Sequence, residues 1–224
     1  MANPAYLSVW AKGFSEATML EQFAQFLKTV PASTGTPKFS ELVIRAVNPS
    51  ETLVIERDLR ARPLEAEEVV ELAREHLHSD SAYEVGSHWD LWTYDAETRH
   101  WKFGPQRLEL HCRGEEYDDG AYVEGGHFQA EIGFEHLFTG HGRLLGARAG
   151  IVAPPEHPAE VEFLAAMSRP ENLREYHQKT RENIQKLLGW IGALEEALPI
   201  ERYRLWSEGE ENFEARLDEI LAVR

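Results

Sequence analysis

The sequence predicts an α+β protein in which a mixed, mainly antiparallel sheet is followed by a C-terminal layer of helices. Two observations indicate this class. Apolar and polar residues alternate with a period of two through the stretch from residue 83 to residue 138, as they do in strands with one buried face. From residue 156 onward the apolar positions recur every three or four residues instead, which is typical of helices.

The length of 224 residues is consistent with one domain over 1–224. Within it we expect a sheet with two helices over 1–138, a connection rich in glycine and arginine over 139–155, and a helical layer over 156–224. A hydrophobic content of 42% with 28% charged residues argues against a disordered chain.

The first part of the chain has the order βαββαβ, which predicts a ferredoxin-like start. Ser15 is expected to cap a helix that Pro31 ends, and Pro63 to begin a second one. This order is shared by proteins of many functions, so it implies no activity. The expected strands are 5–10, 39–47, 52–57 and 83–91.

Two further strands are expected to extend the sheet by hairpins. A first hairpin that turns between Asp95 and His100 places Tyr94 opposite Trp101. The same register sets three more pairs: Trp92 with Phe103, His88 with Arg107, and Glu84 with His111. Each strand then has one apolar and one polar face, and this agreement supports the register.

The last part of the chain is predicted to be helical throughout. A short helix around 161–168 precedes a long one that Pro170 begins and Pro199 ends. Apolar residues over 213–221 predict a final amphipathic helix. The long apolar stripe needs a surface against which it can be buried, and the sheet is the expected one.

Charge and cysteine content exclude several classes of protein. The chain has 23 Lys and Arg against 39 Asp and Glu, a formal charge of −16, which repels nucleic acid and suits a basic protein partner. The single cysteine, Cys112, rules out an internal disulfide and is expected to be a buried hydrophobe. No segment has the roughly 20 apolar residues of a membrane span, and no leader is evident, so we expect a cytoplasmic protein with no membrane partner.

The polar face of the middle strands offers a candidate metal site. His111 and His127 are expected on neighbouring strands with Glu131 close by, a set that suits a divalent transition metal such as zinc or non-haem iron. The alternative is a solvated face with cross-strand charge pairs and no cofactor. No His-Glu-x-x-His spacing favours the metal.

The connection after the middle strands offers a candidate anion site. His141, Arg143 and Arg148 lie in an interval without Asp or Glu that also contains four glycines. Backbone N–H groups beside glycines can surround an anion, and arginines supply charge. The glycine spacing is neither that of a Walker loop nor that of a dinucleotide fingerprint, and an ordinary connection would have the same composition.

Three aromatic residues on the polar face form a candidate partner surface. Trp92, Trp101 and Phe103 share one side of the first hairpin, where exposure to water is costly. Either the C-terminal helices cover them or another protein does, and we expect the helices to do so because their apolar stripe needs a partner.

No stretch resembles a known family closely enough to transfer functional residues. We expect a non-catalytic, acidic protein-binding module of the inhibitor or immunity type that neutralises a basic partner protein. The charge of −16 and the absence of a catalytic motif support this hypothesis. Two alternatives stay open: a metal-dependent hydrolase or oxygenase with the His/His/Glu site, and a binding module for a small anionic ligand.

Overall fold

A computed structural model describes residues 3–95, 98–141, 144 and 158–222. The described strands form one antiparallel sheet of seven strands in the order β3-β2-β4-β5-β6-β1-β7. The strands are β1 Pro4–Ala11, β2 Phe39–Ala46, β3 Ile55–Asp58, β4 Ser81–Asp95, β5 His100–Arg113, β6 Phe128–Phe134 and β7 Ile200–Ser207.

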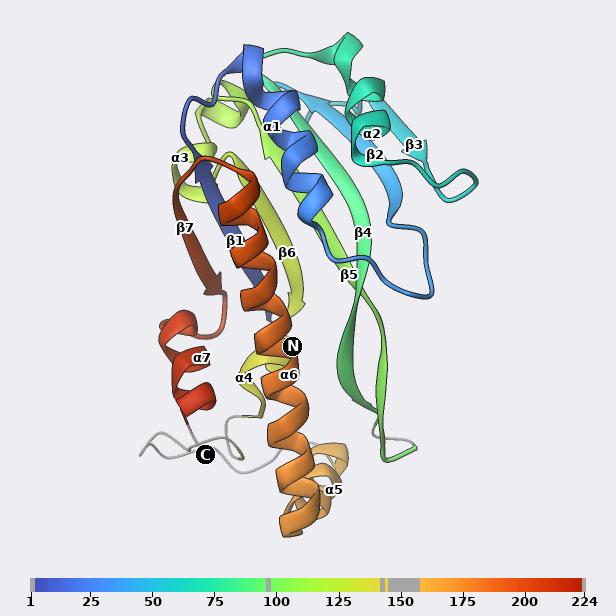
Figure 1. The fold of residues 1–224 in the computed structure, drawn as a ribbon, viewed down its shortest axis with the longest axis vertical. Coiled ribbons are helices and arrows are strands. Elements are labelled where there is room, and N and C mark those ends of the chain that lie inside the picture. The colour runs from blue at the N-terminus through green and yellow to red at the C-terminus, as the bar shows by residue number, and fades with distance from the viewer. Residues whose placement is uncertain (1–2, 96–97, 142–143, 145–157, 223–224) are drawn as a thin grey trace.

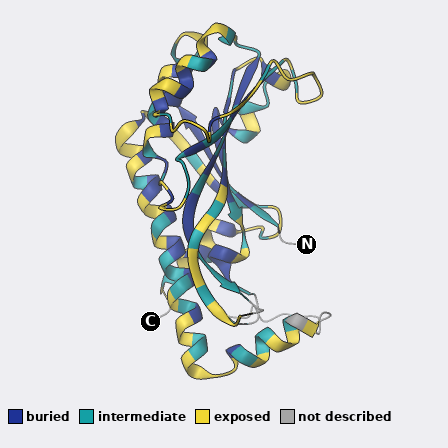
Figure 2. Ribbon diagram, turned by 90° about the vertical axis from the view of Figure 1, so that its right-hand side faces the viewer, coloured by how far each residue is buried: buried dark blue, intermediate teal, exposed yellow. Residues whose placement is uncertain are grey.

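Seven α-helices are described, and the two longest, α1 and α6, lie over the same face of the sheet (Figure 1). In the view turned by 90°, the long helix runs along one side of the sheet (Figure 2). None of the described helices is long and apolar enough to cross a membrane. The helices are α1 Glu16–Thr29, α2 Ala66–Ala73, α3 Tyr122–Gly125, α4 His136–Thr139, α5 Pro158–Met167, α6 Pro170–Ala197 and α7 Phe213–Ala222.

The core lies between α1, α6 and the sheet face that they cover, which we call the inner face. Every second residue of the central strands is buried on this face because side chains alternate along a strand. Phe26 of α1 stacks on Phe128 of β6 with ring centres 5.2 Å apart. Trp190 of α6 contacts Phe26 and Trp89, so helix–helix and helix–sheet packing meet at one residue. Burial of this apolar surface is the main force that stabilises the fold.

The hairpin of β4 and β5 extends beyond its neighbours as an arm, made of residues 88–95 and 100–107 (Figure 1). Strand β2 pairs with β4 only as far as Ser87, so the backbone of β4 has no strand neighbour on that side within the arm. Helix α6 takes this place. The Asn183 side chain accepts a hydrogen bond from the Trp92 N–H (2.8 Å) and donates one to the Trp92 carbonyl (3.0 Å). Lys186 donates to the Asp90 carbonyl (2.7 Å).

The α+β class, the hairpin register and the long helix are confirmed. Tyr94 lies opposite Trp101, and Glu84 lies opposite His111, as the two-faced pattern predicted. Helix α6 begins at Pro170, and Cys112 is buried.

Three expectations about the sheet need correction. All described strand pairs are antiparallel, so the sheet is not mixed. Residues 200–207 were expected to be helical, but they form strand β7, and their side chains alternate between the two faces of the sheet. The ferredoxin-like start is not confirmed, because β1 pairs with β6 and β7 and does not lie beside β4. Between β6 and β7, Leu7 of β1 lies opposite Ala130 on one side and Leu205 on the other, and all three residues are buried.

Candidate functional site

The face opposite α1 and α6, which we call the outer face, carries a row of four residues on adjacent strands. Trp206 of β7 lies opposite Tyr6 of β1, Tyr6 opposite Glu131 of β6, and Glu131 opposite Glu109 of β5. Their neighbours along each strand point into the core, so these four side chains point outward. We call this set the acidic row.

Two carboxylates face each other in the acidic row. Burial and the charge of Glu109 raise the pKa of Glu131, the charge of Arg107 partly opposes this, and the described residues provide no ion pair to Glu131 itself. Glu109 forms its own ion pair with Arg107. Beside them, Tyr6 stacks on Trp206 at 4.3 Å and donates a hydrogen bond to Glu208 (3.2 Å). Burial, with the charges of Glu131 and Glu208, raises the pKa of Tyr6 to about 12. The row therefore holds a neutral tyrosine and unbalanced negative charge.

The next row of the outer face contains an ion pair, a second arginine and a neutral histidine. Arg45 pairs with Glu84 (2.8 Å), and His111 lies between Glu84 and Gln129 on the adjoining strands. Arg113 donates to the side-chain oxygen Oε1 of Gln129 (2.7 Å). Burial lowers the pKa of His111 to about 3, and the charges of Arg113 and Arg45 act in the same direction. His111 is therefore neutral at physiological pH.

His127 lies at the end of the sheet, apart from the acidic row. Its ring is stacked between Phe14 (4.1 Å) and Tyr122 (4.8 Å), and Nδ1 accepts a hydrogen bond from the Ala11 N–H (3.1 Å). Burial lowers the pKa of His127 to about 4, so the neutral ring is the form that this packing holds.

The three residues of the candidate metal site are not brought together. His111 lies beside Glu84, Glu131 lies beside Glu109, and His127 uses Nδ1 for the backbone. In the described part of the chain, no group of three His, Cys, Asp or Glu side chains is arranged to hold a metal ion. The metal site therefore remains a prediction without geometric support.

Acid is expected to destabilise the protein through His127. Because its pKa is lower in the folded protein than in the unfolded chain, the unfolded chain binds the proton more readily. This contribution to stability is complete above pH 6.5, and about 1–2 kcal/mol of it is lost between pH 6.5 and pH 5. Urea unfolding across this range measures the loss from His127 together with that from His111, whose pKa is also lowered, and NMR titration of the His127 ring determines the share of His127.

His100→Gln is the matched control for this measurement, because His100 is exposed at the start of β5. The variant should keep the pH dependence of the wild-type protein. A His127 ring that titrates near pH 6.5 in the folded protein would contradict the packing described above.

The candidate anion site lies largely outside the described residues. Of its three residues, His141 is described, whereas Arg143 and Arg148 are not. The His141 N–H donates to the Tyr176 hydroxyl oxygen (2.6 Å), and its Nε2 lies 3.1 Å from Glu160. The anion site stays a prediction.

Helix α6 covers two of the three aromatic residues of the candidate partner surface. Trp92 donates from Nε1 to Glu182 (2.5 Å), and the ammonium group of Lys179 lies 3.5 Å from its ring centre. Trp101 contacts Tyr176 with ring centres 5.5 Å apart. Phe103 remains 52% exposed, so the helix covers the surface incompletely.

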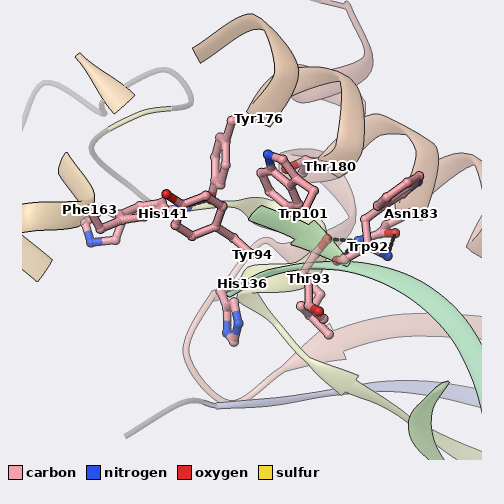
Figure 3. A pocket seen from close by; sticks show the side chains of 11 residues that line it. Trp92, Thr93, Tyr94, Trp101, His136, His141, Phe163, Tyr176, Thr180 and Asn183 are labelled. Carbon is pink, nitrogen blue, oxygen red and sulfur yellow. Dashed lines mark hydrogen bonds between the residues drawn. The ribbon is translucent and has the colours of Figure 1, made fainter. Parts of the chain in front are cut away.

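A partly open cavity of about 240 Å³ lies between the arm, α4, α5 and α6 (Figure 3). Four of its rings form a closed cycle of contacts with centres 5.3–5.7 Å apart. The polar side chains of its wall include His136, Thr180 and Asn183. The sequence identified Trp101 as a surface aromatic but did not predict the cavity, because the wall comes from five separate elements. The four rings are Tyr94, Trp101, Phe163 and Tyr176.

Comparisons with protein-family models, curated proteins and solved structures gave no match for this chain. The fold and the site define an α+β protein with an acidic, aromatic outer face and a separate aromatic cavity. Its function must therefore be argued from these two features.

Proposed function

We propose that the chain is a non-catalytic binding module of the inhibitor or immunity type, which acts in the cytoplasm and neutralises a basic protein partner through the acidic row. The observation that carries this proposal is the half-buried carboxylate of Glu131, which faces Glu109 without an ion pair among the described residues. Like charges opposite each other on adjacent strands destabilise a sheet. A lysine or arginine of a partner relieves that repulsion on binding.

The surroundings of the two carboxylates support the same partner chemistry. The Tyr6–Trp206 stack provides ring surface beside the negative charge, and tyrosine and tryptophan are enriched where binding energy concentrates. The net charge of −16 attracts a basic protein over distances longer than a contact and speeds the encounter. Position, ring surface and charge therefore favour a basic partner over an acidic or nucleic-acid one.

Glu131→Gln is expected to stabilise the free protein by about 0.5 kcal/mol at pH 7, because it removes one of two facing charges. The raised pKa means that ionisation of Glu131 opposes folding, so the gain disappears as the pH falls below 4.5. Urea unfolding at pH 7 and at a pH below 4.5 measures the difference in unfolding free energy between the variant and the wild-type protein. Glu201→Gln, exposed on β7 outside the acidic row, should change neither value.

The proposal is tested by capture from host extract at low and high salt, followed by titration of each captured protein after repurification. The expected partner is basic, binds more weakly as salt rises, and loses about tenfold in affinity with Glu131→Gln. Glu201→Gln should bind like the wild-type protein. Recovery of no partner at either salt concentration, or a partner indifferent to Glu131→Gln, overturns the proposal.

The two alternatives have tests of their own. A metal-dependent hydrolase or oxygenase that uses His111, His127 and Glu131 requires near-stoichiometric zinc, iron or manganese in protein purified without chelator. A module for a small anion at Arg143 and Arg148 requires stabilisation by phosphates or carboxylates in a thermal-shift screen.

A further inference from the structure

The wall of the cavity combines aromatic rings with a buried polar side chain that has no partner among the described residues. Thr180 is 3% exposed, and its hydroxyl forms no hydrogen bond with any described residue. His136, in contrast, is exposed, and its ring stacks on that of Phe134 with centres 5.9 Å apart, so water can bond to its ring nitrogens.

Buried polar groups in native proteins nearly always have a hydrogen-bond partner, either in the protein or in ordered water. Tyr176, also buried, adds a second group: its hydroxyl oxygen accepts from the His141 N–H, which leaves the hydroxyl proton available. Two buried hydroxyl groups in an aromatic wall therefore call for an occupant with hydrogen-bonding atoms.

The charges of the wall limit what that occupant can be. None of the described residues that line the cavity is Asp, Glu, Lys or Arg. Glu160, which lies beside His141, is already paired with it at 3.1 Å. An ion that entered would lose water without gaining an opposite charge, which is costly. The wall is thus suited to an uncharged molecule.

The volume limits the size of the occupant. A cavity of about 150 Å³ holds one benzene molecule, so 240 Å³ has room for two fused rings. Aromatic rings prefer stacked or edge-on contact with other rings, and the cavity offers rings from β4, β5, α5 and α6 (Figure 3).

From these observations we propose that the cavity is a binding site for a small, uncharged, planar aromatic molecule of one or two fused rings with a hydrogen-bonding substituent. The rings of Tyr94, Trp101 and Tyr176 contact its faces and edges, and the hydroxyl groups of Thr180 and Tyr176 bind its polar group. The site shares no residue with the acidic row, so it is independent of the proposed binding of a basic protein.

The test is titration of the full chain with indole and 2-naphthol, followed by calorimetry and ligand-detected NMR. We expect saturable binding with a Kd on the order of 0.1 mM, which corresponds to a moderate binding free energy per non-hydrogen atom for ligands of this size. Benzoate and benzyltrimethylammonium, which add a negative and a positive charge to one ring, should bind at least about tenfold more weakly.

Two substitutions of Thr180 distinguish a binding site for aromatic molecules from a cavity that holds only water. Thr180→Leu fills the cavity and should abolish binding of both probes, while Thr180→Val keeps the volume and should weaken 2-naphthol about three- to tenfold. Gln185→Leu, exposed on the same helix, is the matched control and should bind like the wild-type protein. Thermal unfolding of each variant verifies that it is folded.

Absence of saturable binding of both uncharged probes to the folded wild-type protein overturns the proposal and leaves water as the occupant. Equal binding to wild-type protein and Thr180→Leu overturns it as well, because the probes then bind elsewhere. Tighter binding of either charged probe would show that the class of ligand is wrong.

Discussion

Replacing Trp190 by alanine is expected to lower the free energy of unfolding by about 3–5 kcal/mol, the usual cost of removing a large buried aromatic side chain. Trp190 is 2% exposed. Its ring lies 6.1 Å from that of Phe26 and 5.8 Å from that of Trp89, and Nε1 donates to the Thr29 hydroxyl (3.0 Å). The Trp190 side chain thus connects α6 to α1 and to Trp89, near the start of the arm.

Urea unfolding at neutral pH measures this effect, with two variants for comparison. Trp190→Phe keeps part of the ring contact but loses the hydrogen bond to Thr29, so it should cost about half as much. Leu188→Ala changes a residue that is 39% exposed on the same helix and should cost about 1 kcal/mol or less. If Trp190→Ala costs no more than Leu188→Ala, then α6 does not pack on α1 as described.

The hairpin register could be predicted from the sequence because it depends on local alternation. In β4 and β5 the buried residues, such as Trp89 and Leu110, recur with period two on both sides of one turn. A shift of one residue would move every buried side chain into water, so the pattern excludes odd shifts, and the position of the turn between Asp95 and His100 sets the register among the rest. The start of α6 could also be predicted from a local feature, because a proline such as Pro170 suits the first turn of a helix.

The position of β1 could not be predicted in this way. Leu7 is buried between Ala130 and Leu205, which lie more than a hundred residues further along the chain. Alternation shows which face of a strand is buried, but it does not show which strand is the neighbour. Strand β7 was not predicted because it lies between helices in a part of the chain whose apolar spacing is otherwise helical, although Arg204 and Leu205 point to opposite faces.

The difference between local patterns and long-range pairing also explains which parts of the two candidate sites could be predicted from the sequence. Glu131 was singled out because its strand follows β5 directly, whereas Tyr6 and Trp206 join the row only through the pairing of β1 with β6 and β7. The cavity requires α5 and α6 to lie against the arm, and no local pattern specifies such an arrangement. Thr180 lies at a position of the apolar stripe of α6, and helical spacing alone does not show that its hydroxyl faces a cavity.

Asn183→Ala is expected to lower the free energy of unfolding by about 3 kcal/mol, although it removes only a few atoms. The Asn183 side chain makes three hydrogen bonds: it accepts from the Trp92 N–H and donates to the carbonyls of Trp92 and Leu137 (2.9 Å). Alanine leaves these groups without their partner, at about 1 kcal/mol each or more. Since the amide acts as a neighbouring strand for β4, its loss should loosen the arm in particular.

Urea unfolding gives the total cost, and hydrogen exchange at the Trp92 amide shows where the cost falls. Exchange at Trp92 should rise by more than exchange at Leu42, which is buried in β2 outside the arm. Asn172→Ala is the matched control, because this asparagine makes one side-chain hydrogen bond, to the Ala166 carbonyl (2.8 Å), and should cost about 1 kcal/mol. Equal exchange at Trp92 and Leu42 would mean that the arm unfolds only with the whole protein, so α6 would stabilise the entire sheet rather than the arm alone.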